Sequence, residues 1–107
     1  MFIESENNRH ITNQELMELR KKSKINLIDI RELYEYNICH IEGALLIPLG
    51  KLMRDHEQIL QKNNTYYLYC HTGQRSYFMT DFLTKEGYDV VNVLGGIADN
   101  DEFNVPY

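Results

Sequence analysis

The apolar residues of the chain gather in short blocks whose spacing alternates between that of strands and that of helices. Short runs rich in apolar and β-branched residues are typical of buried strands, and they occupy residues 26–30, 44–48, 66–70 and 90–94. The neighbouring segments carry helical spacing or helix-boundary residues, and we predict helices over 13–22, 31–36, 49–61 and 76–86. This alternation predicts a small α/β domain with a mainly parallel sheet.

Capping signals set several of the predicted helix ends. Thr12 and Glu15 have the spacing of a capping box, so a helix should begin directly after Thr12 and run over 13–22. Gly87 supplies a left-handed stop after the helix over 76–86. These signals agree with the hydrophobic pattern and strengthen the alternation of strands and helices.

Length and composition describe one ordinary folded domain. With 107 residues, of which 43% are hydrophobic and 25% charged, the chain predicts a single domain over residues 1–107. We expect the core over about residues 11–98, with short extensions at both ends. Two cysteines are too few for a disulfide scaffold, so we expect a reducing compartment and thiol chemistry.

The charge balance limits the partners. Sixteen acidic residues against eleven basic ones give a net charge of −5. An acidic surface repels phosphate backbones and anionic lipids, so we expect no nucleic-acid and no membrane partner. The apolar runs are far shorter than the ~20 residues of a membrane helix, and the first residues lack the features of a secretory signal. We therefore expect a cytoplasmic protein.

The segment from Cys70 to Ser76 follows a predicted buried strand, at the position where parallel α/β sheets bind ligands. Gly73 permits a tight backbone path, and Ser76 is expected to cap the following helix. Converging amides and a helix N-terminus make an anion-binding nest, to which Arg75 adds cationic donors. Such a nest favours a thiolate, so we interpret Cys70 as a nucleophile rather than an inert core residue.

The spacing of Cys70 and Arg75 separates two chemistries. A cysteine phosphatase needs Cys-x5-Arg, because its longer loop encloses a whole phosphoryl group. Here the spacing is Cys-x4-Arg, and Ser76 occupies the position that the phosphatase arginine would need. The smaller cradle suits a thiolate and a transferable sulfur atom, so phosphatase activity is disfavoured.

Motifs along most of the chain resemble the single-domain rhodanese family of sulfurtransferases. The resemblance rests on four segments in a fixed order, residues 27–32, 40–49, 70–76 and 94–97. It implies a small three-layer α/β domain in which about five parallel strands are flanked by helices. It also implies a reaction that uses neither a cofactor nor a metal ion.

By the same resemblance, Cys70 takes a sulfane sulfur from a small donor such as thiosulfate or a persulfide. The Cys70 persulfide then passes the sulfur to a thiol or to cyanide, and a protein could also act as donor or acceptor. Arg75 would help to hold an anionic donor, and Asp29 and Arg31 would brace the site. The loop residues that would cradle the persulfide are His71, Thr72, Gly73, Gln74, Arg75 and Ser76.

Two positions depart from the usual pattern of the family. Asn100 stands where an aromatic residue often follows the Gly-Gly turn, so we expect looser packing of the C-terminal segment and of the pocket rim. Residues 99–107 should end loosely rather than in a full helix. Cys39 stands where glycine is common.

Two other functions remain open at this point. One is a rhodanese-like module without catalysis that binds a protein partner or acts in stress. The other is a thiol redox or arsenate-handling enzyme that pairs Cys70 with Cys39, although a small buried role is favoured for Cys39. Metal binding by the pairs Cys39-His40 and Cys70-His71 is disfavoured, because adjacent residues on an extended chain point apart.

The remaining polar residues have mainly structural interpretations. Asp29 lies in an apolar strand and needs a partner, for which the neighbouring arginine and the loop amides are candidates. We expect His40 to be a hydrogen-bonded structural residue, and His10 and His56 to be exposed. His71 either lines the entrance to the site or acts as an acid or base.

Overall fold

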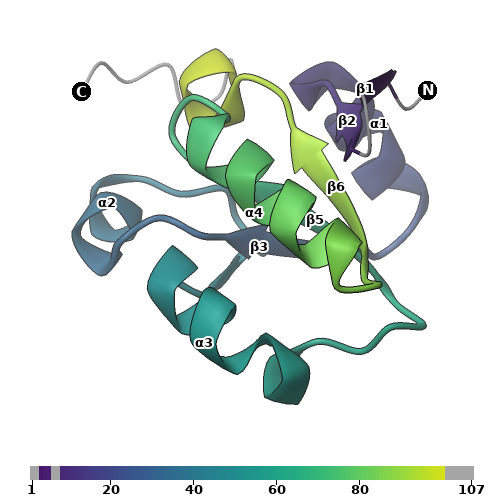
Figure 1. Ribbon diagram of the computed structural model, residues 1–107. Helices are drawn as coiled ribbons and strands as arrows, with labels where there is room; N and C mark the ends of the chain where they lie inside the picture. Colours follow the sequence, from purple (N-terminus) through teal and green to yellow (C-terminus); the bar gives the residue numbers. More distant parts are fainter. Residues whose placement is uncertain (1–2, 6–7, 101–107) are drawn as a thin grey trace.

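The computed structural model describes residues 3–5 and 8–100, in which six strands form one sheet with the order β1-β2-β6-β5-β3-β4 (Figure 1). The strands are β1 (Ile3–Ser5), β2 (Asn8–Ile11), β3 (Asn26–Asp29), β4 (Leu45–Leu46), β5 (Thr65–Tyr69) and β6 (Asp89–Val93). The five strands from β2 to β4 in this order run parallel, and β1 pairs antiparallel with β2. The predicted, mainly parallel sheet is confirmed.

Helices cover both faces of the sheet. They are α1 (Asn13–Lys22), α2 (Leu33–Ile38), α3 (Leu49–Ile59), α4 (Gln74–Lys85) and the short 3-10 helix η1 (Gly96–Asp99). Apolar residues of α3 and α4 pack on one face, and those of α1 and η1 pack on the other. The predicted three-layer architecture is therefore confirmed. Within the described ranges no helix has both the length and the apolar character of a membrane span.

The continuous apolar run of β5 is explained by burial on both faces of the sheet. Tyr66 and Leu68 belong to the core under α3 and α4, whereas Tyr67 and Tyr69 belong to the core under α1 and η1. Since β5 lies between β6 and β3, neither of its edges faces solvent. This central strand brings Cys70 to the carboxyl edge of the sheet.

The boundaries of α2 and β4 differ from the prediction. The predicted helix over 31–36 lies instead at Leu33–Ile38, because Glu32 and Glu35 form a capping box that sets its start. In this box the Glu35 carboxylate accepts the Glu32 N–H at 3.0 Å. The predicted strand over 44–48 pairs with β3 only at Leu45–Leu46.

The expectation that His10 and His56 are exposed is wrong, because both side chains are buried. The His10 ring stacks on Tyr77, with ring centroids 5.3 Å apart, and its Nδ1 lies 3.2 Å from the Asn92 amide nitrogen. Burial lowers the pKa of His10. The His56 ring meets Phe82 edge-on at 5.3 Å. Both imidazole rings therefore pack against aromatic side chains.

The described C-terminal end is packed, contrary to the expected looseness. Within the described residues the Gly-Gly turn leads into η1, which spans Gly96–Asp99. Asn100, however, is buried, and its amide donates to the Asn13 side chain at 3.0 Å. The expectation of a loose end over 101–107 lies outside the described residues.

Candidate active site

Cys70 lies directly after β5, where its sulfur faces the first turn of α4. The residue is 1% exposed. Its Sγ accepts hydrogen bonds from the Gly73 N–H at 3.1 Å and from the Ser76 N–H at 3.4 Å, and the Ser76 hydroxyl oxygen lies 3.4 Å away. Donors that converge on one sulfur stabilise its anionic form. Two backbone N–H groups and one hydroxyl thus surround the Cys70 sulfur.

The tight path of the loop depends on Gly73. Its φ of +99° is a left-handed conformation that favours glycine, and a Cβ here would lie 3.1 Å from the Gly95 backbone nitrogen. Gly73 is also the N-cap residue of α4. The expectation that Ser76 caps this helix is therefore wrong: Ser76 lies inside the first turn, where its hydroxyl is directed at the sulfur.

The short helix η1 holds the start of the loop from the other side. The Ile97 N–H donates to the Cys70 carbonyl at 3.0 Å, and the Ala98 N–H donates to the His71 carbonyl at 2.9 Å. Gly96 permits this close approach, because a Cβ there would lie 2.4 Å from the Cys70 carbonyl oxygen. The end of β5 and η1 therefore form one continuous support under the sulfur.

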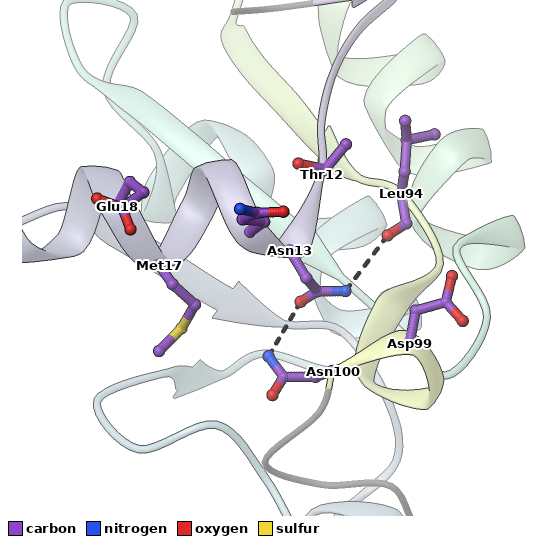
Figure 2. Close-up of a pocket in the computed structure, with 8 residues that line it drawn as sticks. Thr12, Asn13, Met17, Glu18, Leu94, Asp99 and Asn100 are labelled. Carbon is purple, nitrogen blue, oxygen red and sulfur yellow. Dashed lines mark hydrogen bonds between the residues drawn. The ribbon is translucent and has the colours of Figure 1, made fainter.

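A side chain of α1 anchors η1 in turn. The Asn13 amide donates to the Gly96 carbonyl at 2.9 Å. It also donates to the Leu94 carbonyl at 3.4 Å, and Asn13 accepts from Asn100 (Figure 2). A hollow of about 480 Å³ opens beside these bonds. Its lining contains polar and apolar residues, among them two carboxylates but no cysteine or histidine, so it offers neither a thiol nor an imidazole. We assign the asparagines a bracing role.

Arg75 and Glu35 join the loop to α2. Both terminal nitrogens of Arg75 donate to the Glu35 carboxylate, each at 2.8 Å. The side chains are 39% and 7% exposed, respectively. This hydrogen bonding lowers the pKa of Glu35 to about 2 and raises the pKa of Arg75, which the nearby Cys70 also raises. Arg75 is thus close to the sulfur, and both of its terminal nitrogens donate to the Glu35 carboxylate.

Asp29 and Arg31 form a fully buried ion pair next to the loop. The Arg31 Nη2 lies 2.8 Å from the Asp29 carboxylate and also donates to the Cys39 carbonyl at 2.7 Å. The Tyr69 hydroxyl donates to Asp29 at 2.7 Å and accepts the Ile41 N–H at 3.1 Å. Burial and the Asp29 charge raise the pKa of Tyr69, so its hydroxyl remains a donor. Of the two partners predicted for Asp29, the neighbouring arginine is confirmed.

Cys39 and Cys70 lie on opposite faces of the sheet. Cys39 is half-buried rather than fully buried and packs against the core under α1 and η1, whereas Cys70 belongs to the core under α3 and α4. This placement disfavours a redox pair between the two thiols. The structural interpretation of His40 is confirmed, because its Nδ1 lies 2.9 Å from the Tyr36 carbonyl and its ring stacks on Tyr36.

The other loop side chains lie at the surface of the site. His71 is partly buried, and Thr72 and Gln74 are exposed. Thr72 and Gln74 border a cavity of about 280 Å³ between the loop and the end of β6, which Tyr77 and Asn92 also line. In the part of the chain that the structure describes, no three His, Cys, Asp or Glu side chains gather as a possible metal site.

Sequence reasoning missed Glu35 and Tyr69 as parts of this arrangement. The capping-box spacing after Glu32 indicates that Glu35 belongs to a helix start, but nothing in the sequence shows that it meets Arg75, 40 positions later. Tyr69 reads only as an apolar strand residue, and its bond to Asp29 also spans 40 positions. Both contacts depend on the order of strands in the sheet.

Comparisons with known proteins find one family. The family model for the rhodanese-like domain matches residues 12–100. The thiosulfate sulfurtransferase PspE of Escherichia coli is 34% identical over 73 residues, which are 67% of this chain and 70% of that protein. The thiosulfate sulfurtransferase GlpE of Coxiella burnetii is 29% identical over 89 residues, 82% of each chain.

Solved structures and longer relatives extend this result. A crystal structure of a rhodanese-like domain protein from Staphylococcus aureus has a TM-score of 0.79 and 34% identity, and the match covers 85% of this chain and 89% of that one. Other bacterial relatives are longer: the chain spans 40% of one from Bacillus subtilis and 23% of one from Mycobacterium tuberculosis.

Proposed function

This chain belongs to the rhodanese-like domain family, and on that basis we propose that it is a sulfurtransferase in which Cys70 carries the sulfur as a persulfide. The observation that supports this most directly is the convergence of two backbone N–H groups and one hydroxyl on the Cys70 sulfur. Thiosulfate is the donor we propose, since two relatives are thiosulfate sulfurtransferases.

In the first half of the reaction the Cys70 thiolate attacks the outer sulfur of thiosulfate. A bond forms between Sγ and that sulfur, the S–S bond of thiosulfate breaks, and sulfite leaves with the electron pair. Cys70 becomes a persulfide whose terminal sulfur is negatively charged. The loop amides and the N-terminus of α4 stabilise this charge without rearrangement, because the turn is already fixed by Gly73 and by η1.

In the second half an acceptor removes the sulfur. A thiolate or cyanide attacks the terminal sulfur of the persulfide, the bond between Cys70 Sγ and that sulfur breaks, and the electron pair returns to Sγ. The products are an acceptor persulfide or thiocyanate, together with the original Cys70 thiolate. No external oxidant, reductant or cofactor enters this balance.

The other site residues position the loop in this proposal. Arg75 fixes the first turn of α4 against α2 through Glu35 and contributes positive charge near the sulfur, where it helps to hold an anionic donor. Asp29 and Arg31 brace the ends of β3 and β5 from inside. The backbone of residues 71–76 cradles the persulfide.

The test is intact-mass analysis before and after incubation with thiosulfate, combined with a thiocyanate assay in the presence of cyanide. We expect the wild-type protein to gain the mass of one sulfur atom and to form thiocyanate. The variant Cys70→Ser should do neither, while Cys39→Ser should behave as the wild type.

Two outcomes would contradict the proposal. If neither the wild type nor Cys70→Ser gains sulfur or turns over, the chain is a module without this catalysis. If Cys39→Ser abolishes turnover, the second thiol takes part, and a redox mechanism replaces simple sulfur transfer.

A further inference from the structure

Exposed apolar side chains flank the ion pair that joins α2 to α4. Ile38 lies three residues after Glu35 and is 58% exposed, and Phe78 lies three residues after Arg75 and is 53% exposed. Residues three apart share a helix face, so each apolar side chain lies beside one member of the pair. Tyr34, 68% exposed, lies one turn before Ile38 on the same face of α2. We call these three residues the α2–α4 rim.

The rim lies beside the first turn of α4, which also contacts the Cys70 sulfur. Arg75 directly precedes Ser76, whose N–H lies 3.4 Å from the Cys70 sulfur, and it joins α2 to the first turn of α4 through Glu35. Figure 1 shows α2 and the start of α4 at the same end of the sheet, on the left of the view. Cys70 itself is almost fully buried, and its sulfur lies against the loop and the first turn of α4.

The charges around the rim favour a partner segment with basic side chains. The two arginines of the site are each bonded to a carboxylate, Arg31 to Asp29 and Arg75 to Glu35. Residues 32–50, which include α2, contain three glutamates and no lysine or arginine. Arg75 neutralises Glu35, so the exposed charges of this segment are those of Glu32 and Glu42. The exposed charge of this segment is therefore negative, and it attracts positive charge on a partner.

We propose that the α2–α4 rim docks a protein sulfur acceptor whose reactive cysteine lies on a segment with apolar and basic side chains. This inference rests on the proposed function and specifies its substrate class. A small donor needs only the Cys70 sulfur and its cradle, so exposed aromatic and aliphatic groups beside the site add nothing to its binding. A protein segment can cover them and bury their apolar surface.

The transfer step is the second half-reaction with a protein thiolate as acceptor. The acceptor sulfur attacks the terminal sulfur of the Cys70 persulfide and forms a new S–S bond. The bond from that sulfur to Cys70 Sγ breaks, and its electron pair remains on Sγ as thiolate. The net change moves one neutral sulfur atom between two thiolates, so no further reactant is required.

The binding test uses synthetic peptides and does not depend on sulfur chemistry. The probe is a fluorescent peptide with a serine between two leucines, flanked by lysines, and its control has glutamates in place of the lysines. By fluorescence anisotropy the wild type should bind the basic peptide about tenfold more tightly than the acidic one. The double variant Ile38→Ser/Phe78→Ser should lose about tenfold in affinity for the basic peptide.

Leu45→Ser is the matched control. Leu45 is also an exposed apolar residue, at 62%, but it lies on β4 and borders a cavity with Ile59 and Leu60, outside the α2–α4 rim. Its variant should bind the basic peptide as the wild type does. The docking proposal would be overturned if the Leu45 variant and the rim variant lost equal affinity for the basic peptide, or if the rim variant lost none.

The transfer test uses the same peptide with cysteine in place of serine. After Cys70 has been converted to the persulfide, the rim variant should pass sulfur to this peptide about tenfold more slowly than the wild type does. It should pass sulfur to cyanide at the wild-type rate. Equal slowing with both acceptors would place the rim in the catalytic machinery and overturn the proposal. If Cys70 takes up no sulfur while the peptide still binds at the rim, the proposed function fails and the docking site stands.

A second copy of this chain is the other occupant to test. Sedimentation of the wild type and the rim variant over a range of concentrations distinguishes it. We expect both proteins to show the same oligomeric state. A wild-type dimer that dissociates in the rim variant would assign the rim to self-association and would exclude a docked acceptor.

Discussion

At the scale of single residues, the Ser76 hydroxyl is a side-chain group within hydrogen-bonding distance of the Cys70 sulfur. It lies 3.4 Å from Sγ, beside two backbone donors. Backbone donors cannot be removed one at a time by a side-chain change, whereas this hydroxyl can. Ser76 therefore allows the contribution of the cradle to be measured at one atom.

Ser76→Ala should slow the alkylation of Cys70 by iodoacetamide at neutral pH by about fivefold, because a lost hydrogen bond of about 1 kcal/mol reduces the stabilisation of the thiolate. The rate is measured in a Cys39→Ser background, so that only one thiol reacts. Thr80→Ala is the control, since it removes another buried hydroxyl in α4 and should leave the rate unchanged. An unchanged rate in Ser76→Ala would show that the hydroxyl does not support the thiolate.

Tyr69 offers a second test at this scale. Tyr69→Phe leaves both the Asp29 carboxylate and the Ile41 N–H without the hydroxyl that joins them, so we expect a loss of about 2 kcal/mol in the free energy of unfolding. Tyr66→Phe removes a hydroxyl that accepts from Gln61, an exposed residue, and should cost less than about 1 kcal/mol. Urea unfolding of both variants measures these losses in the free energy of unfolding. Equal losses in the two variants would contradict the bracing role of Tyr69.

At the scale of elements, the contact between η1 and the end of β5 requires a glycine at position 96. A Cβ at Gly96 would lie 2.4 Å from the Cys70 carbonyl oxygen and 2.5 Å from the His71 carbonyl oxygen, and φ is +58°. Gly96→Ala should therefore lower the free energy of unfolding by about 3 kcal/mol and reduce sulfur transfer per folded molecule.

Gly50→Ala is the matched control for that change. Gly50 lies in α3, and a Cβ there meets nothing within 4 Å. Because alanine favours a helix over glycine, this variant should raise stability by about 0.5–1 kcal/mol. Both changes are read from urea unfolding, with turnover measured alongside. If Gly96→Ala were as stable and active as Gly50→Ala, η1 would not support the loop.

The elements that the sequence predicts well are those with a local cause. The capping box at Thr12 and Glu15 sets the start of α1, and the continuous apolar run of β5 indicates burial on both faces. The strand β2 has the polar residues Asn8, Arg9 and His10, so the hydrophobic pattern does not show it. It forms because β6 offers an edge, which is a property of the assembled sheet.

The candidate site divides in the same way. Cys70 and Gly73 are predictable, because a strand end, a thiol and a left-handed turn follow one another in the chain. The Glu35–Arg75 bond and the support from η1 are not predictable, because they join segments that only the strand order brings together. The capping role expected for Ser76 is wrong, because α4 begins two residues earlier and Gly73 is its N-cap residue.

At the scale of the whole molecule, the Glu35–Arg75 pair couples the stability of the fold to pH. The pKa of Glu35 is lowered to about 2 in the folded protein from an ordinary 4.5. A carboxylate with a lowered folded pKa adds stability above its unfolded pKa and loses it as the pH falls toward its folded pKa. The window is therefore about pH 4.5 to 2, on the acid side.

Glu35→Gln tests this coupling, because glutamine keeps the size and the capping oxygen but not the charge. The shift corresponds to about 3 kcal/mol, which we reduce to about 2 kcal/mol because Arg75 is partly exposed to solvent. By urea unfolding, the wild type should exceed Glu35→Gln by that amount at pH 7, and the difference should shrink steadily below pH 4.5. Lys85→Gln, which breaks the exposed pair with Asp81, should change stability by less than about 0.5 kcal/mol. A difference that stays constant down to pH 2 would show that Glu35 acts through its shape rather than its charge, and that the tie between α2 and the loop is not electrostatic.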